Sequence, residues 1–152
     1  MYALERLIYV SNAAEKLRMS DVVRIIRASD ALNRRDGVSG VLLYSDQRFM
    51  QCIEGTVAGV QDVYWRIVNS TAHHGIVEMF NGTANARRFE NWQWAYRSEQ
   101  MQRYSSPATK SFLNQQSADG MPFVEQNILA AFWGDSQGAN HLWAAQEEME
   151  KT

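Results

Sequence analysis

Three polar side chains stand where the surrounding sequence is apolar and a buried core is expected. Tyr9 lies in the run LIYVS, Gln51 lies within FMQCIE, and Asn33 lies on the apolar side of a helical segment. A phenol with a pKa of about 10 can release its proton as it loses an electron, and a carboxamide both accepts and donates hydrogen bonds. Together they suit proton transfer and hydrogen-bond switching. Taken singly, each is more often structural: a core tyrosine, a satisfied buried glutamine or a helix-end asparagine.

Strands must position the phenol and the carboxamide. Leu4 to Ser11 is a short, β-rich run that predicts a central strand, and Val38 to Ser45 and Phe49 to Glu54 predict a hairpin around the polar residues DQR. Gln51 then shares a strand face with its apolar neighbours two residues away. Since the first and third strands of a split βαβ fold are commonly neighbours, Tyr9 and Gln51 are expected side by side.

Two amphipathic helices are predicted, Met19 to Asn33 and Val57 to Asn69. On the first, Ile25, Ser29 and Asn33 follow one another at intervals of four and therefore share a side. Either Ser20 or Asp21 is the expected N-cap, and Gly37 suits the C-terminal end. The second helix is expected to stop near the histidine pair His73-His74. At a helix C-terminus a histidine cation interacts favourably with the helix dipole, and this interpretation is preferred to a metal site, which would need further ligands nearby.

Two further strands are expected, Ile76 to Gly82 and about Trp92 to Ser98. The order is then βαββαββ, an α+β, ferredoxin-like sheet with both helices on one face. Beyond Ser105 the segments Pro122 to Trp133 and His141 to Glu150 are compatible with helices. Because their apolar residues are too few for a separate core, we expect a domain at residues 1–100 and a helical extension at 101–152 that docks on the sheet or on another subunit.

Composition excludes several classes of function. The net charge is −2, and the arginine pairs Arg34-Arg35 and Arg87-Arg88 are short enough to be solvated loop charges, so no nucleic acid is expected. The single cysteine, Cys52, cannot form an internal disulfide, and no apolar run approaches the ~20 residues that span a bilayer. A soluble cytoplasmic protein, not associated with a membrane, is the simplest interpretation.

The sequence resembles the BLUF family of blue-light photosensors. The resemblance rests on LIYVS, on GVSGVLLYSDQRFMQCIEG and on RRFENWQW, and it spans roughly residues 4 to 98. It implies a bound flavin, with Tyr9 as the electron and proton donor, Gln51 as the hydrogen-bond switch and Asn33 at the polar edge of the ring. It further implies flavin contacts from Ile25, Ser29, Arg66 and Ile67, and His73 is a candidate for a phosphate contact.

The last strand departs from the family pattern. Trp92 matches a tryptophan of the family, but the usual methionine two residues later is replaced by Trp94. In the family these two positions are associated with signal relay. Alternation places both indoles on one face, where they either compete for the position near Gln51 or simply cover the sheet.

The resulting hypothesis is a non-enzymatic blue-light receptor that binds FAD, or alternatively FMN, without a covalent bond or a metal. Its output would pass through the last strand and the C-terminal helices to a protein partner or to a change of oligomer, and a dimer or larger homo-oligomer is expected. Two alternatives remain open: a small ferredoxin-like enzyme acting on an acidic substrate, and a structural dimerisation module without flavin.

Overall fold

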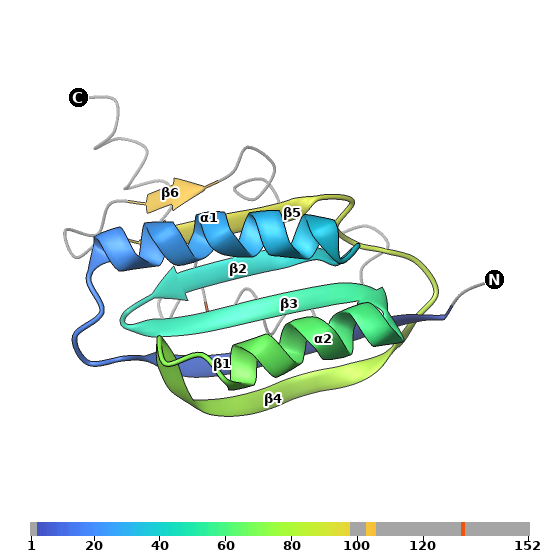
Figure 1. The fold of residues 1–152 in the computed structure, drawn as a ribbon, viewed down its shortest axis with the longest axis horizontal. Helices are drawn as coiled ribbons and strands as arrows, with labels where there is room; N and C mark the ends of the chain where they lie inside the picture. The colour runs from blue at the N-terminus through green and yellow to red at the C-terminus, as the bar shows by residue number, and fades with distance from the viewer. Residues whose placement is uncertain (1–2, 98–102, 106–131, 133–152) are drawn as a thin grey trace.

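A single mixed sheet with two helices on one face forms the described part of the chain. The computed structural model describes residues 3–97, 103–105 and 132. The sheet has the strand order β4-β1-β3-β2-β5-β6, and helices α1 and α2 lie over the same face (Figure 1). The elements in chain order are β1 (Leu4–Ala13), α1 (Met19–Arg35), β2 (Ser39–Ser45), β3 (Arg48–Thr56), α2 (Val57–Val68), β4 (His73–Ala84), β5 (Trp92–Arg97) and β6 (Arg103–Ser105). The α+β, ferredoxin-like prediction is confirmed.

The central hairpin forms as its sequence predicts. β2 and β3 pair antiparallel from Ser39↔Glu54 to Ser45↔Arg48. The two connecting residues, Asp46 and Gln47, have φ values of 54° and 61°. Two consecutive left-handed residues match the right-handed twist of the strands, so the turn fixes the register of the hairpin without a glycine.

Helix α1 begins at Met19 as predicted, but its N-cap lies two residues before Ser20, the nearer of the two expected caps. Arg18 is the N-cap, and the carboxylate of Asp21 accepts a hydrogen bond from the Arg18 backbone N–H at 2.9 Å. Asp21 therefore caps the helix from its third residue, where the positive end of the helix dipole also stabilises the carboxylate. At the other end, Gly37 adopts the expected positive φ of 69°, which glycine accommodates without a Cβ clash.

Helix α2 ends sooner than predicted. Its N-cap Thr56 accepts from the Gly59 N–H at 3.1 Å, and the helix stops at Val68. His73 and His74 are the first residues of β4, not the last of the helix, because this edge strand pairs with β1 as far as Ala13↔His73. Backbone pairing with an existing strand outweighs the local helical pattern there.

The two faces of the sheet carry separate apolar clusters. The face beneath the helices includes Leu42, Ile53 and Trp92 together with Val22 of α1 and Val63 of α2. The opposite face is packed with the buried residues Ile8, Val41, Leu43, Met50, Cys52, Phe89, Ala95 and Phe132. Most of the expected tail helices lie outside the described residues; Phe132 alone is described, and it is buried on this second face with Arg48 over its ring at 5.4 Å.

The last strands also refine the prediction. β4 is longer than expected at both ends, and β5 runs parallel to β2 from Gly40↔Trp92 to Tyr44↔Tyr96. β6 was not predicted; it pairs antiparallel with β5 over three residues. None of the described helices is long and apolar enough to cross a bilayer.

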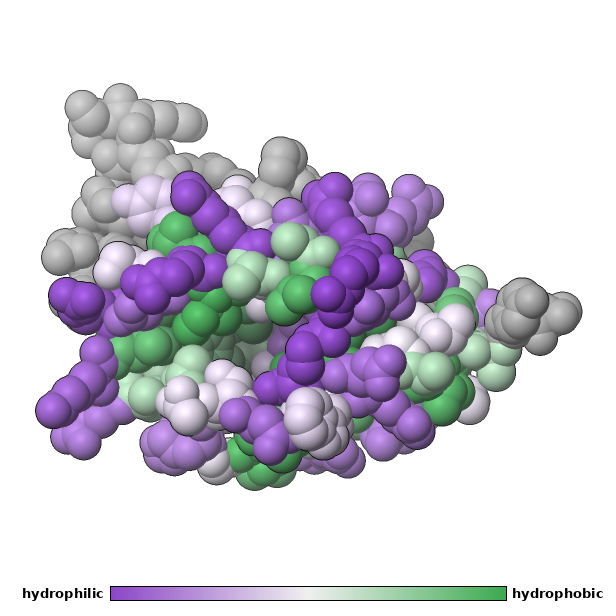
Figure 2. All heavy atoms as spheres, viewed as in Figure 1, coloured by the Kyte–Doolittle hydropathy of each residue, from purple (hydrophilic) through white to green (hydrophobic). Residues whose placement is uncertain are grey.

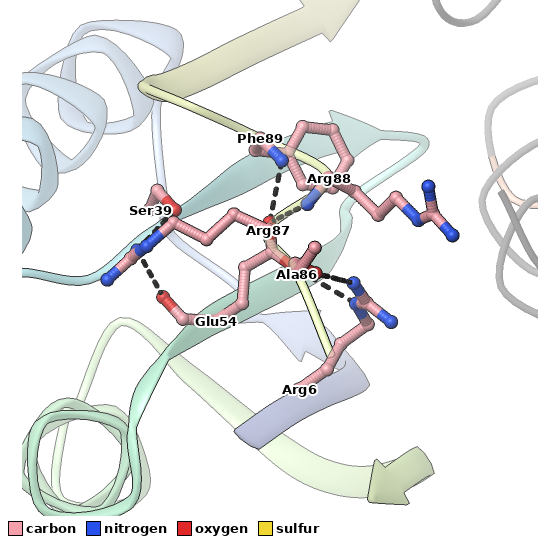
Figure 3. Close-up of polar contacts among 7 residues, drawn as sticks. All are labelled: Arg6, Ser39, Glu54, Ala86, Arg87, Arg88 and Phe89. Carbon is pink, nitrogen blue, oxygen red and sulfur yellow. Dashed lines mark hydrogen bonds and ion pairs between the residues drawn. The ribbon is translucent and has the colours of Figure 1, made fainter. Parts of the chain in front are cut away.

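A buried ionic network fixes the segment that leads into β5. Glu54 is fully buried and receives the Arg6 guanidinium at 2.9 Å on one oxygen, while the backbone N–H groups of Arg88 and Phe89 donate to the other, both at 2.6 Å (Figure 3). Arg87 donates to Ser39 Oγ at 2.7 Å and to the carbonyls of Glu54 and Gly37.

The arginine pairs therefore differ in environment. Arg34 and Arg35 are solvated as expected, with side chains 66% and 64% exposed, but they lie in the last turn of α1 and not in a loop. The expectation of a solvated charge is wrong for Arg87, which ties the connection between β4 and β5 to the ends of α1 and β3.

Candidate functional site

A cleft opens between α1 and α2 above the centre of the sheet. Its empty volume is about 710 Å³, part of which is open to solvent. On this face, apolar surface lies in the trough between the more hydrophilic outer sides of the two helices (Figure 2). The residues that line the cleft are Tyr9, Ile25, Ser29, Leu32, Asn33, Leu42, Phe49, Gln51, Val63, Arg66, Ile67, Ser70, Ala72 and His73.

The phenol and the carboxamide meet at the floor of this cleft. Tyr9 and Gln51 are direct partners in the antiparallel pairing of β1 and β3, and both are 3% exposed. The Tyr9 hydroxyl donates to Gln51 Oε1 at 2.5 Å. Burial, with a smaller effect of the neighbouring Tyr64, raises the pKa of Tyr9 far above its usual value. The predicted contact is confirmed, and the phenol is held in its protonated form.

These two residues belong to a row that crosses the sheet. Gln51 is opposite Leu42 on β2, and Leu42 is in turn opposite Trp94 on β5. Side chains of directly paired residues project from the same face, so Tyr9, Gln51, Leu42 and Trp94 lie in sequence beneath the helices. The row joins the cleft to the far side of α1.

Helix α1 contributes a buried amide without a partner. Asn33 is 3% exposed, and its Nδ2 has no hydrogen-bond partner among the described residues. A buried polar group left unpaired costs about 1–3 kcal/mol, so a native site normally supplies a partner. Asn33 lines the cleft with Ser29 and Ile25, one and two turns earlier. Their predicted common side is thus confirmed, and the amide fits a ligand that presents a hydrogen-bond acceptor.

Helix α2 contributes a cation to the cleft. Arg66 pairs through Nη1 with Asp36 at 2.8 Å, whereas its buried Nη2 has no partner in the described part of the chain. Hydrogen bonds from Arg35 and Arg66 hold the pKa of Asp36 below its usual value. Asp36 thereby orients Arg66, and the remaining donor is suited to an anionic or carbonyl group. Ile67, the next residue, supplies apolar wall.

His73 lines the cleft with both ring nitrogens engaged. Its Nε2 is 2.6 Å from the Ile67 carbonyl, and its Nδ1 is 2.6 Å from Ser11 Oγ. Because a carbonyl only accepts, Nε2 must carry a proton, and a neutral ring accepts from the serine hydroxyl at Nδ1. The ring links β1 to the end of α2 and leaves no free N–H for a phosphate. The expectation of a phosphate contact has no support in this geometry.

The two tryptophans lie on the helix-covered face but do not line the cleft. Trp92 is 4% exposed within the apolar cluster, and its ring N–H has no partner among the described residues. Trp94 is half-buried and stacks on Tyr96 with ring centroids 5.7 Å apart. Their shared face is confirmed, but neither indole is among the residues that surround Gln51 in the cleft.

Sequence reasoning missed several residues of the site. Leu42 and Phe49 are cleft residues that the hairpin register could have revealed, since one is opposite Gln51 and the other is two positions before it. Ser70 and Ala72 come from the turn after α2, a connection to which the sequence analysis assigned no role. Within the described residues there is no group of histidine, cysteine and acidic side chains that could hold a metal ion.

Comparison with known proteins gives one consistent result. The family model described as sensors of blue light using FAD matches residues 4–95. A photoactivated adenylate cyclase subunit beta from Euglena gracilis is 31% identical over 91 residues, which are 59% of this chain and 11% of that protein. The blue light- and temperature-regulated antirepressor BluF of Escherichia coli is 30% identical over 86 residues, which are 57% of this chain and 21% of that protein. The chain thus spans only a small part of these curated relatives.

Solved structures agree with the fold. The dark-state structure of BlrB, a BLUF protein, is 32% identical with a TM-score of 0.59 and covers 66% of this chain and 76% of its own. The photo-activated state of BlsA is 25% identical with a TM-score of 0.58 and covers 72% and 76%. With a family model that matches well over half of its residues, this chain belongs to the BLUF family of blue-light sensors that bind flavin.

Proposed function

We propose that this chain senses blue light through one flavin bound non-covalently in the cleft between α1 and α2, and that it is not itself an enzyme. FAD is the first choice, since the family is described as using FAD, and FMN is the second. The observation that carries the proposal is the Tyr9–Gln51 hydrogen bond at the floor of a cleft with unpaired buried donors on both helices.

The cleft residues fit a flat, partly polar ring system. Ile25 and Ile67 supply apolar walls from opposite helices, and Asn33 supplies an amide for the polar edge of the ring. Arg66 supplies a cation for a carbonyl or phosphate oxygen. Ser29 adds a hydroxyl one turn before the amide. When bound, a flavin supplies absorption of blue light and, once excited, a strong one-electron oxidant.

Tyr9 is prepared to lose an electron and a proton together. Its burial keeps the phenol neutral in the dark, because the phenolate is disfavoured away from water. Loss of an electron makes the phenol strongly acidic, and the Gln51 oxygen, 2.5 Å away, is the group positioned to receive its proton. A phenylalanine at this position has neither the hydroxyl nor the proton.

Gln51 can hold two hydrogen-bond patterns with the same neighbour. With Oε1 toward Tyr9 the amide accepts, and with Nε2 toward Tyr9 the amide donates to the phenol oxygen. Either pattern keeps one hydrogen bond between the amide and the phenol, so the amide has two discrete states in a low-dielectric pocket where exchange between them is electrostatically significant. The change is transmitted along the row through Leu42 to β5, with Trp92 and Trp94 as relay residues. The output is a change in a protein partner or in a homo-oligomer.

Absorption spectroscopy of the purified protein tests the proposal. We expect a yellow protein whose flavin band shifts to the red in blue light and returns in the dark. Tyr9→Phe and Gln51→Leu should retain the flavin and lose this shift. Tyr64→Phe is the matched control, because its ring centroid is 6.2 Å from that of Tyr9 but it does not line the cleft. A colourless protein, or a normal photocycle in Tyr9→Phe, would contradict the assignment.

A further inference from the structure

A second groove lies on the other side of α1 from the flavin cleft. It is lined by Val23, Ile26, Arg27 and Asp30 of α1 and by Trp94 and Tyr96 of β5, with an empty volume of about 550 Å³. In Figure 1, α1 lies over the sheet with α2 and β3 on one side and β5 on the other. The same helix therefore borders both hollows, with Ile25, Ser29 and Asn33 facing the cleft.

Aromatic rings form one wall of this groove. Trp94 stacks on Tyr96 at 5.7 Å with an interplanar angle of 23°, and Tyr96 stacks on Tyr104 of β6 at 5.0 Å and 24°. Trp94 and Tyr96 are half-buried, and Tyr104 is 42% exposed. Stacked rings with accessible surface suit an additional aromatic side chain, since aromatic pairs are worth about 0.5–1.5 kcal/mol beyond their buried area.

The groove carries one guanidinium, Arg27, for which no ion pair is seen among the described residues. Arg27 is exposed, and its charge lies close enough to Tyr96 to oppose the rise in the pKa of that phenol that burial causes. Asp30, one turn later, is already paired with Arg34 at 2.6 Å. Of the two charged residues that line the groove, only Arg27 is without an ion-pair partner in the described part of the chain, and a carboxylate would complement it.

The groove is connected to the flavin cleft by paired residues. Trp94 ends the row that begins with Tyr9 and Gln51, and only Leu42 separates it from Gln51. Tyr96 lies opposite Tyr44, which packs on the cleft residue Phe49 with ring centroids 5.0 Å apart. Neighbouring side chains of adjacent strands thus form a continuous path from the floor of the cleft to the groove.

We propose that this groove is the docking site for a segment of a partner protein that presents an aromatic side chain next to a carboxylate. The ring packs on Trp94 and Tyr96, and the carboxylate pairs with Arg27. The proposal rests on the proposed sensor function, since it names the surface by which that sensor meets its partner. It also gives a role to the indole that replaces the usual methionine.

Two tripeptides test the groove on the whole chain with its flavin bound. Acetyl-Asp-Tyr-Glu-amide is the acidic aromatic probe, and acetyl-Lys-Tyr-Lys-amide is its charge-reversed counterpart. Binding is followed by NMR shifts of the Trp94 indole N–H and of the amides of α1, in the dark and in blue light. We expect the acidic peptide to bind about tenfold more tightly than the basic one, with about a fivefold change on illumination.

Variants separate the groove from general surface charge. Arg27→Glu should reverse the preference between the peptides, and Trp94→Ala should weaken both. Arg24→Glu, on the same helix but paired with Asp21 and outside the groove, should leave the preference unchanged. Equal binding of the two peptides, or an equal loss in Arg24→Glu, overturns the proposal.

Other occupants give distinct results. If neither peptide binds while sedimentation shows that Arg27→Glu dissociates a homo-oligomer, the occupant is a second copy of this chain and the proposal is wrong. The flavin red shift is recorded on the same samples. Its presence without peptide binding refutes the groove alone, whereas its absence refutes the sensor function itself.

Discussion

Replacement of the buried carboxylate Glu54 by glutamine tests how strongly the ionic network holds the sheet. Glu54→Gln keeps the size of the side chain but removes its charge and one of its two acceptor oxygens. Each oxygen receives two donors, from Arg6 on one side and from the backbone of Arg88 and Phe89 on the other. One pair of donors must therefore meet the new NH₂ group instead of an acceptor.

The expected cost follows from the hydrogen bonds that the substitution removes. Hydrogen bonds to a charged group contribute about 1.5–3 kcal/mol each, and loss of one partner of a buried pair costs about 3–5 kcal/mol. We therefore expect Glu54→Gln to lower the free energy of unfolding by about 3–5 kcal/mol, a large part of the roughly 5–15 kcal/mol of a typical domain.

Urea unfolding of the wild type and the variant measures this difference. Asp30→Asn is the control: it breaks the exposed Arg34 pair, which solvent screens, and should cost less than about 1 kcal/mol. A double-mutant cycle with Arg6→Met then isolates the pairwise contribution of the guanidinium. A cost for Glu54→Gln no larger than that of Asp30→Asn would refute the description of this network as a buried anchor.

Two further predictions concern Tyr9 and Trp94. Because burial raises the pKa of Tyr9, the folded state keeps a proton that the unfolded state releases above about pH 10. The free energy of unfolding of the wild type should therefore fall by up to about 1.4 kcal/mol per pH unit above that pH. Urea unfolding at about pH 9 and about pH 11 measures this fall, which should be smaller in Tyr9→Phe. Trp94→Met removes the stacking on Tyr96 but changes no residue that lines the cleft, so flavin binding should be unchanged. Dark recovery, followed by absorption, should become about fivefold faster, because about 1 kcal/mol of aromatic contact is lost. Loss of the flavin from this variant would contradict the placement of Trp94 outside the cleft.

The sequence by itself determined the two helices, the central strands and the centre of the site. Alternation in β1 and β3, the short polar turn between β2 and β3, and the four-residue spacing on α1 are local patterns that depend on backbone geometry. From them the contact between Tyr9 and Gln51 and the common side of Ile25, Ser29 and Asn33 could be predicted. The structure confirms both.

Only the tertiary structure decided what lies around that centre. The parallel register of β5 on β2 places Trp94 at the end of the row from Gln51, and no local pattern encodes a register between strands so far apart in the chain. The same holds for Glu54, whose partners come from β1 and from the connection between β4 and β5. From the sequence alone, a charged residue is predicted to be exposed to solvent. Burial of a charge is tolerated only where the fold places a counter-charge or hydrogen-bond donors beside it, and the sequence pattern does not show which residues those are.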